Sequence, residues 1–239
     1  MVTVPAIGTV YVILNQKLII GICKDSYYTT KSIADAEYTE KKSRFIGHCC
    51  PISSVAEAEE LIAFYKKKYW DARHNCYAFR IGDSARSSDD GEPSGTAGVP
   101  ILNVLTQTQV TDTLIVVTRY FGGILLGAGG LVRAYSKTAK DALSASGIIC
   151  MEPCIRLEVN APYTLFTAVE KVLRENDLDI DAQYSDTVHV ISYVPIRLTD
   201  LIIDRIIDRT DGKCMPCKGD IKYLPFAVSS NGIKENENA

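Results

Sequence analysis

The stretch TRYFGGILLGAGGLVRAY, residues 118–135, contains five of the chain's sixteen glycines. The apolar, β-branched run that leads into it predicts a buried strand, and the pattern over 126–146 predicts a helix that Gly147 ends. A glycine-rich passage from a strand into a helix can turn free backbone N–H groups toward an anion. The same glycines also suit a tight corner with positive φ, so the stretch is either a binding site or a structural turn.

Motif spacing excludes two nucleotide-binding loops here. No Gly-Lys-Ser/Thr follows the glycines, and Val132 occupies the third glycine position of a dinucleotide fingerprint. The remaining functional interpretation is an anion or phosphate-backbone site, because three cations recur at i, i+4 and i+7 on the predicted helix. The candidate contacts are Arg119, Gly122, Gly123, Gly127, Gly129, Gly130, Arg133, Lys137 and Lys140. The structural alternative is a solvated helix face.

A second cluster of polar residues lies in the predicted loop 82–98. Its candidate residues are Asp89, Asp90, Glu92, Ser94 and Thr96. Three carboxylates in four positions could hold Mg²⁺ or supply a general base. They could also form a turn, with Ser94 or Thr96 capping the next helix. We favour a structural or partner-contact role over catalysis.

Composition places the chain among ordinary globular proteins. Of its 239 residues, 46% are hydrophobic, and the net charge of −3 argues against a wholly basic nucleic-acid binder. Residues 38–147 carry a net charge of +2 and residues 151–228 carry −4, so the first half is the better candidate to meet a polyanion. No secretory signal and no apolar run of membrane-spanning length are present, which predicts a cytoplasmic protein without a membrane partner.

The eight cysteines do not form a convincing site. His74 and Cys76 lie two residues apart on a predicted strand, which is more typical of a packed cysteine than of a nucleophile. The pair Cys214 and Cys217 has zinc-like spacing, but no matching second pair follows a recognised ligand pattern. We therefore expect no metal and no cofactor.

The order of predicted elements divides the chain in two near 147–153. Strands at 38–52, 75–81 and 111–120 alternate with helices that begin near Ser54, Pro100 and Leu126. The second half then reads strand 155–160, helix 163–176, a hairpin of 179–184 with 187–193, helix 199–209 and strand 221–228. This β-α-β-β-α-β order is ferredoxin-like, so the expected class is α+β. Two short β-like runs, 9–14 and 17–22, precede these elements.

Four ordered motifs carry a family resemblance. They are SRFI at 43–46, RHNC at 73–76, DDGEPSGTAG at 89–98, and VTRYFGG with GAGGL at 117–123 and 127–131. With them the chain resembles the IMPACT/YigZ family in its two-domain, bacterial form. The resemblance implies an N-terminal domain at 27–149 similar to domain IV of elongation factor G, and a ferredoxin-like domain at 150–228. Residues 1–26 would be an extension outside the resemblance, and 229–239 a disordered tail.

The resemblance also sets the functional expectations. Eukaryotic family members act as translation regulators by binding a protein partner, and for bacterial members nucleic-acid or ribosome binding is the usual suspicion. We expect a non-catalytic, translation-associated regulator that binds RNA or the ribosome through its basic, glycine-rich surface. The alternatives are a magnesium-dependent enzyme acting on a phosphate-containing substrate at 89–92, and a protein-interaction module in translation control.

Overall fold

The computed structural model describes residues 12–14, 17–19 and 25–227. Chain contacts form two compact units, one built on Tyr27–Met151 and the other on Glu152–Leu224. A short antiparallel hairpin of β1 (Val12–Leu14) and β2 (Lys17–Ile19) precedes them. The outer residues of the two β-like runs predicted for this region, and the predicted tail 229–239, lie outside the described residues.

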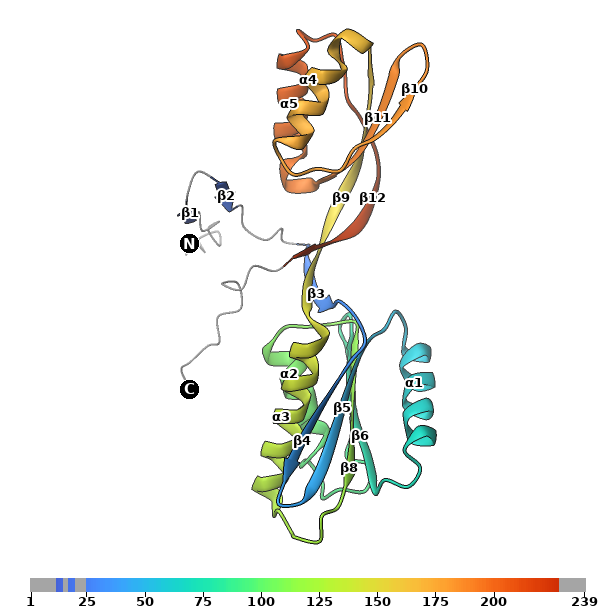
Figure 1. Ribbon diagram of the computed structural model, residues 1–239, viewed down its shortest axis with the longest axis vertical. Helices are drawn as coiled ribbons and strands as arrows, with labels where there is room; N and C mark the ends of the chain where they lie inside the picture. The colour runs from blue at the N-terminus through green and yellow to red at the C-terminus, as the bar shows by residue number, and fades with distance from the viewer. Residues whose placement is uncertain (1–11, 15–16, 20–24, 228–239) are drawn as a thin grey trace, which may run out of the picture. The chain divides into compact units, whose positions relative to one another are not determined.

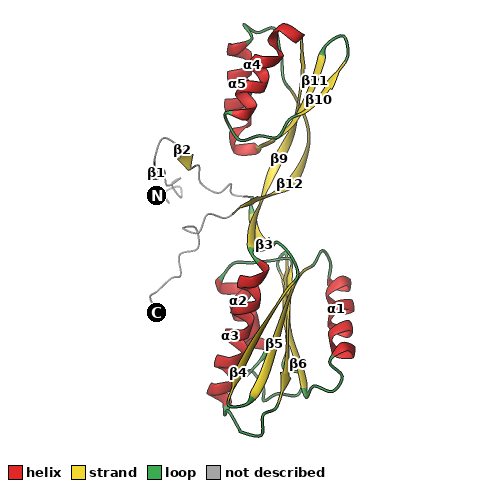
Figure 2. Ribbon diagram, viewed as in Figure 1, coloured by secondary structure: helices red, strands yellow, loops and turns green. Residues whose placement is uncertain are grey.

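The first unit is a mixed layer structure around one antiparallel sheet. Helices cover both faces of that sheet, α2 and α3 on one side and α1 on the other (Figures 1 and 2). The strand order is β4-β5-β8-β6-β7. Its strands are β4 (Ala34–Glu40), β5 (Ser43–Pro51), β6 (His74–Ile81), β7 (Ser84–Ser88) and β8 (Thr113–Tyr120). Its helices are α1 (Val55–Lys68), α2 (Gly98–Gln107) and α3 (Ala128–Ser146).

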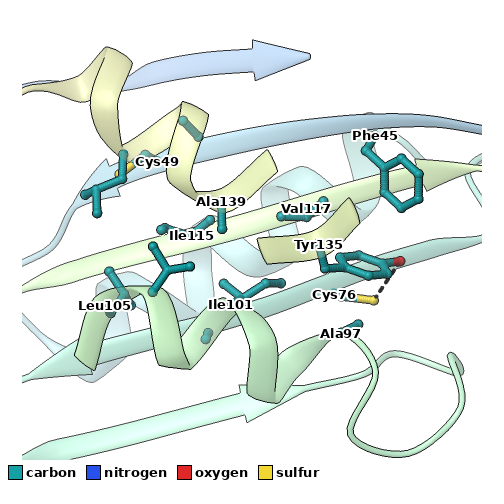
Figure 3. Packing of buried hydrophobic residues seen from close by; sticks show 14 of the residues in the cluster. Phe45, Cys49, Cys76, Ala97, Ile101, Leu105, Ile115, Val117, Tyr135 and Ala139 are labelled. Atoms are coloured by element: carbon teal, nitrogen blue, oxygen red, sulfur yellow. Dashed lines mark hydrogen bonds between the residues drawn. The ribbon is translucent and has the colours of Figure 1, made fainter. Parts of the chain in front are cut away.

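Two hydrophobic cores fill the spaces between sheet and helices. On the α2–α3 side, Phe45 packs edge-on against Tyr135 with 5.2 Å between ring centroids (Figure 3). On the α1 side, Ile62 and Tyr65 pack on Leu114 and neighbouring strand residues. Successive side chains of a strand point to opposite faces, which explains why β8, buried on both sides, has an uninterrupted apolar run at residues 114–117.

In the first unit, the sequence patterns located the helices well and the hairpins poorly. Helix α1 begins where Ser54 accepts a hydrogen bond from the Glu57 N–H at 3.1 Å, as the capping signal predicted. The strand predicted over 38–52 is instead β4 and β5, joined by a two-residue turn in which Lys41 and Lys42 have φ of 44° and 66°. The predicted loop 82–98 contains the short edge strand β7. Lys41 and Lys42 are not typical residues of a two-residue hairpin turn, so the sequence gave no sign of the turn between β4 and β5.

The second unit has the predicted ferredoxin-like order. Its sheet is ordered β10-β11-β9-β12, and α4 and α5 pack on one face of it. The elements are β9 (Ile148–Ala161), α4 (Tyr163–Arg174), β10 (Asp181–Tyr184), β11 (Val188–Pro195), a short 3-10 turn (Ile196–Leu198), α5 (Thr199–Arg209) and β12 (Cys217–Ala227). Strand β3 (Tyr27–Thr30) pairs with the first residues of β9, in the part of β9 that belongs to the first unit.

A buried histidine makes the first unit's stability depend on pH. His48 stacks on Tyr65 and Tyr69, at 4.3 and 5.0 Å between ring centroids, and its Nδ1 lies 2.7 Å from an Asp35 carboxylate oxygen. Burial lowers the pKa of His48 below its usual value, although Asp35 opposes the shift and Lys68 adds to it. In the unfolded chain a histidine becomes protonated near pH 6.5, whereas in the folded protein His48 stays neutral down to its lowered pKa. The free energy of unfolding therefore falls as pH drops from about 6.5 toward that lowered pKa.

We expect the substitution His48→Phe to remove this part of the pH dependence. Comparing urea midpoints of wild type and variant at pH 7.5 and pH 5.5 isolates the contribution of His48 from that of the carboxylates. The wild type should lose more stability over this interval than the variant does. Equal losses would show that His48 titrates with the same pKa in the folded and unfolded chain.

Candidate functional site

The loop between β7 and α2 is organised by the carboxylate of Asp89. Its oxygens accept hydrogen bonds from the backbone N–H groups of Gly95, Ala97 and Gly98 at 2.8–3.0 Å. Burial disfavours the ionised form, but these three bonds outweigh it and lower the pKa of Asp89. Asp89 therefore accepts hydrogen bonds from backbone N–H groups at the N-terminus of α2 and acts as its cap. The prediction that Ser94 or Thr96 caps this helix is wrong.

The two candidate caps lie elsewhere in the same loop. The Thr96 hydroxyl donates to the Pro93 carbonyl at 2.6 Å, and Ser94 is exposed. A cap that lies nine positions before the first residue of its helix has no local sequence signature, since the known signals place it within three residues.

The start of β6 holds the loop against the sheet. Asp90 accepts hydrogen bonds from the Asn75 N–H at 2.7 Å and from the Lys66 ammonium at 2.6 Å. His74 Nδ1 lies 2.8 Å from the Asp90 carbonyl oxygen, and the Cys76 thiol donates to the Asp89 carbonyl at 3.0 Å. Burial raises the pKa of Cys76, so the thiol stays protonated and unreactive. These contacts make His74 and Cys76 structural partners of the loop.

A buried ion pair joins this loop to the glycine-rich stretch. Arg119 Nη1 lies 2.5 Å from Glu92 Oε1, and the same oxygen accepts a hydrogen bond from the Tyr135 hydroxyl at 2.8 Å. The guanidinium lies over the rings of both Phe45 and Phe121, at 5.4 and 5.7 Å from their centroids. Only 6% of Arg119 is exposed. The expectation that Arg119 contacts phosphate at the surface is therefore wrong, because Glu92 neutralises it in the interior.

The three loop carboxylates are engaged by donors of the protein itself. Asp89 binds backbone N–H groups, Asp90 binds Asn75 and Lys66, and Glu92 binds Arg119 and Tyr135. Within the described part of the chain, no group of three or more His, Cys, Asp or Glu side chains is placed to hold a metal ion. Magnesium prefers several oxygen ligands and retained waters, and these oxygens are not arranged to supply them.

The glycines of residues 118–135 mainly allow the chain to turn tightly between β8 and α3. A Cβ atom on Gly122 would lie 2.0 Å from the carbonyl carbon of Lys42, and the Gly122 N–H donates to the Ser43 hydroxyl at 3.1 Å. Gly127, with φ of 71°, precedes α3. The other candidates are Gly123, which has positive φ, Gly129, which is exposed in the first turn of α3, and Gly130, which is buried against Leu126. Close packing accounts for Gly122 without a ligand.

The predicted basic stripe is exposed on α3 and borders a groove. Arg133, Lys137 and Lys140 all line this groove of about 550 Å³, and Lys41 from the β4–β5 turn lines it as well. Lys137 pairs with Asp141 at 2.9 Å and lies 5.5 Å from the ring centroid of Tyr38. Among the described residues, no carboxylate lies within ion-pair distance of the side chains of Arg133, Lys140 or Lys41. These cations are available to an anion from outside.

Comparison with known proteins identifies the family. The Impact N-terminal domain matches residues 41–143, and a domain of unknown function, DUF1949, matches residues 159–213. Over 216 residues the chain is 42% identical to the IMPACT family member YvyE of Bacillus subtilis, an alignment that covers 89% of this chain and 99% of that protein. The chain belongs to the IMPACT family.

Further relatives fit the same assignment. The IMPACT family member YigZ of Escherichia coli is 39% identical over 142 residues, which cover 57% of this chain and 70% of YigZ. Protein IMPACT of Rattus norvegicus is 34% identical over 100 residues, 38% of this chain and 31% of that protein. A solved structure titled "Crystal structure of an hypothetical protein" aligns with a TM-score of 0.53 at 28% identity, covering 87% of this chain and all of the other.

The Impact N-terminal match encloses both the buried network and the basic stripe. Sequence reasoning missed Tyr135 and Ser43 as members of the network, since a helical tyrosine and a strand serine carry no signal of a polar partner.

In the part of the chain that the structure describes, no helix has the length and apolarity needed to cross a membrane.

Proposed function

We propose that this protein is a non-catalytic, translation-associated regulator that binds RNA or the ribosome through the basic face of α3. Membership of a family that includes the eukaryotic IMPACT proteins supports the association with translation. One observation supports the RNA contact: Arg133, Lys137 and Lys140 line a groove from one exposed helix face, and Lys41 of the β4–β5 turn lines the same groove. Arg119 is not among the proposed contacts, because it is buried in its pair with Glu92.

The stripe suits a sugar-phosphate backbone for a simple geometric reason. Residues at i, i+4 and i+7 follow one face of a helix, so their charges form a row along the groove. Phosphate contacts give affinity that depends steeply on salt and little on base sequence. Three contacts to a single strand predict a loss of about 20-fold in affinity between 50 and 200 mM salt.

Co-sedimentation with ribosomes and titration with a single-stranded RNA, each across a salt series, test the proposal. We expect Arg133→Glu/Lys137→Glu to weaken binding at low salt and to flatten the logarithmic salt dependence by about 1.4, the contribution of two single-strand contacts.

The matched control is Arg205→Glu/Arg209→Glu on α5. This pair has the same i, i+4 spacing and exposure and gives the same change in net charge. It should bind as the wild type does. Binding that is absent, or equally sensitive to both double variants, would contradict the proposal. A stable protein partner with unchanged ribosome binding would instead support an interaction module.

A further inference from the structure

One end of the first sheet carries large apolar side chains that are exposed in the described part of the chain. Trp70, in the turn between α1 and β6, is 82% exposed, and Leu125, in the loop before α3, is 83% exposed. Phe121 and Ile124 in the same loop are each 43% exposed. A tryptophan so far out of the core is unusual, because its ring has a large apolar surface that burial would stabilise.

Strand pairing shows that these side chains share one end of the sheet. Phe121 directly follows β8, whose penultimate residue pairs with His74, the first residue of β6. The Arg73 N–H donates to the Arg119 carbonyl at 3.2 Å, and the Tyr120 hydroxyl donates to the Asp71 carboxylate at 2.9 Å. These bonds fix the turn that carries Trp70 beside the loop that carries Phe121 and Leu125.

Three exposed cations lie at the same end of the sheet as the apolar side chains, together with the exposed carboxylate of Asp71. The β4–β5 turn reaches the same end, since Gly122 packs directly on the Lys42 backbone. Lys41, Lys42 and Arg73 are exposed, and among the described residues none of their side chains has an ion-pair partner. We call the surface made by Lys41, Lys42, Trp70, Arg73, Phe121 and Leu125 the tip. It continues into the groove of α3, because Lys41 lines that groove too.

The mixture of aromatic rings and unpaired cations favours a nucleic acid over a protein. The core of a protein interface is depleted of charged residues, whereas here three cations lie at the same end of the sheet as the apolar groups. Proteins that bind single strands combine a positively charged path for the backbone with aromatic side chains on which bases stack. The Arg119 guanidinium lies over the ring of Phe121, at 5.7 Å from its centroid, and this contact reduces the ordering that the ring needs before a base packs on it.

We infer that the tip binds unpaired bases of an RNA whose backbone follows the α3 groove, with Trp70 as the principal stacking side chain. The inference rests on the proposed function, because it extends the same RNA from the groove onto the tip. It adds a chemical requirement that the basic stripe does not have: the ligand must present exposed bases as well as phosphates.

Trp70 is the chain's only tryptophan, so its fluorescence reports directly on the tip. The experiment titrates the full chain with an unstructured uridine-rich RNA of about 12 nucleotides, within the usual single-strand site sizes. A parallel titration uses inorganic polyphosphate of similar length, which has the charge but no bases. We expect RNA to quench Trp70 emission on binding and polyphosphate to bind without quenching.

Substitutions separate stacking from charge. Trp70→Ala should weaken RNA binding by about 5- to 150-fold, the equivalent of one stacked base, and leave polyphosphate binding unchanged. Trp70→Phe should retain much of the RNA affinity. The matched control is Ile33→Ala, which truncates a side chain 63% exposed just before β4, at the end of that strand opposite to the tip. It should change neither titration.

The outcomes distinguish the two claims. RNA binding that keeps its salt dependence, but shows no quenching and no effect of Trp70→Ala, overturns the inference and leaves the proposed function standing. Equal quenching by polyphosphate also overturns it, because stacking would then not be the cause. Absence of RNA binding in the wild type overturns both. A tip that binds a protein instead would lose that protein with Trp70→Ala while RNA binding stays intact.

Discussion

The substitution Arg119→Met is expected to lower the free energy of unfolding of the first unit by about 3–5 kcal/mol. It removes the guanidinium partner of Glu92 and leaves an almost fully buried carboxylate, with the Tyr135 hydroxyl at 2.8 Å and His74 Nε2 at 3.9 Å as its remaining recorded partners among the described residues. An uncompensated charge in the interior costs far more than an exposed one, since water cannot reach it. Methionine fills a similar volume between Phe45 and Phe121, so the loss reflects charge more than a cavity.

A double-mutant cycle separates the ion pair from the packing. Glu92→Gln removes the charge but keeps an acceptor for Tyr135, and Glu92→Gln/Arg119→Met removes both charges. We expect the double variant to be clearly more stable than the sum of the two single losses predicts. Urea denaturation followed by circular dichroism measures the losses, and amide hydrogen exchange in β8 assigns them to the first unit. Additive losses would mean that Glu92 and Arg119 do not stabilise each other.

Gly122→Ala should be nearly as severe, with a loss of about 3 kcal/mol, at the upper end of the usual cost of overpacking. The added methyl group would lie 2.0–2.3 Å from three backbone atoms of Lys42 and Ser43. Backbone cannot rotate away as a flexible side chain can, so the corner after β8 must move away from the β4–β5 turn. Denaturation in urea measures the loss of stability.

The adjacent glycine provides the control. Gly123 has φ of +82° but nothing within 4 Å of its would-be Cβ. Gly123→Ala therefore introduces only backbone strain, of about 1–2 kcal/mol. If Gly122→Ala costs no more than Gly123→Ala, close approach is not what requires glycine at position 122.

Local patterns predicted most of the fold because they are read within one element. Helical spacing located α1, α3, α4 and α5, and alternating strands and helices gave the ferredoxin-like order of the second unit. The prediction of the first unit failed at the turn between β4 and β5, where two residues decide whether the chain continues as one strand or reverses direction. The turn at Lys41 and Lys42 is stabilised by the pairing of β4 with β5, and no local propensity in the sequence announces it.

The candidate site was predictable in part for the same reason. Spacing along one helix placed Arg133, Lys137 and Lys140 on one exposed face. The burial of Arg119 was not predictable, because it depends on Glu92, 27 positions earlier in the chain, and on the rings that enclose it. Likewise, Asp89 reaches α2 across a folded loop rather than along the sequence. Long-range partners decide whether a charge faces water.

The turn of Lys41 and Lys42 has a consequence for the stability of this unit. Two consecutive residues with positive φ in a two-residue hairpin favour Asn-Gly, and each lysine there raises the energy of the folded backbone by about 1 kcal/mol. The strained hairpin places two exposed lysine side chains at the tip, and Asn-Gly in their place would relieve the strain and remove both charges together.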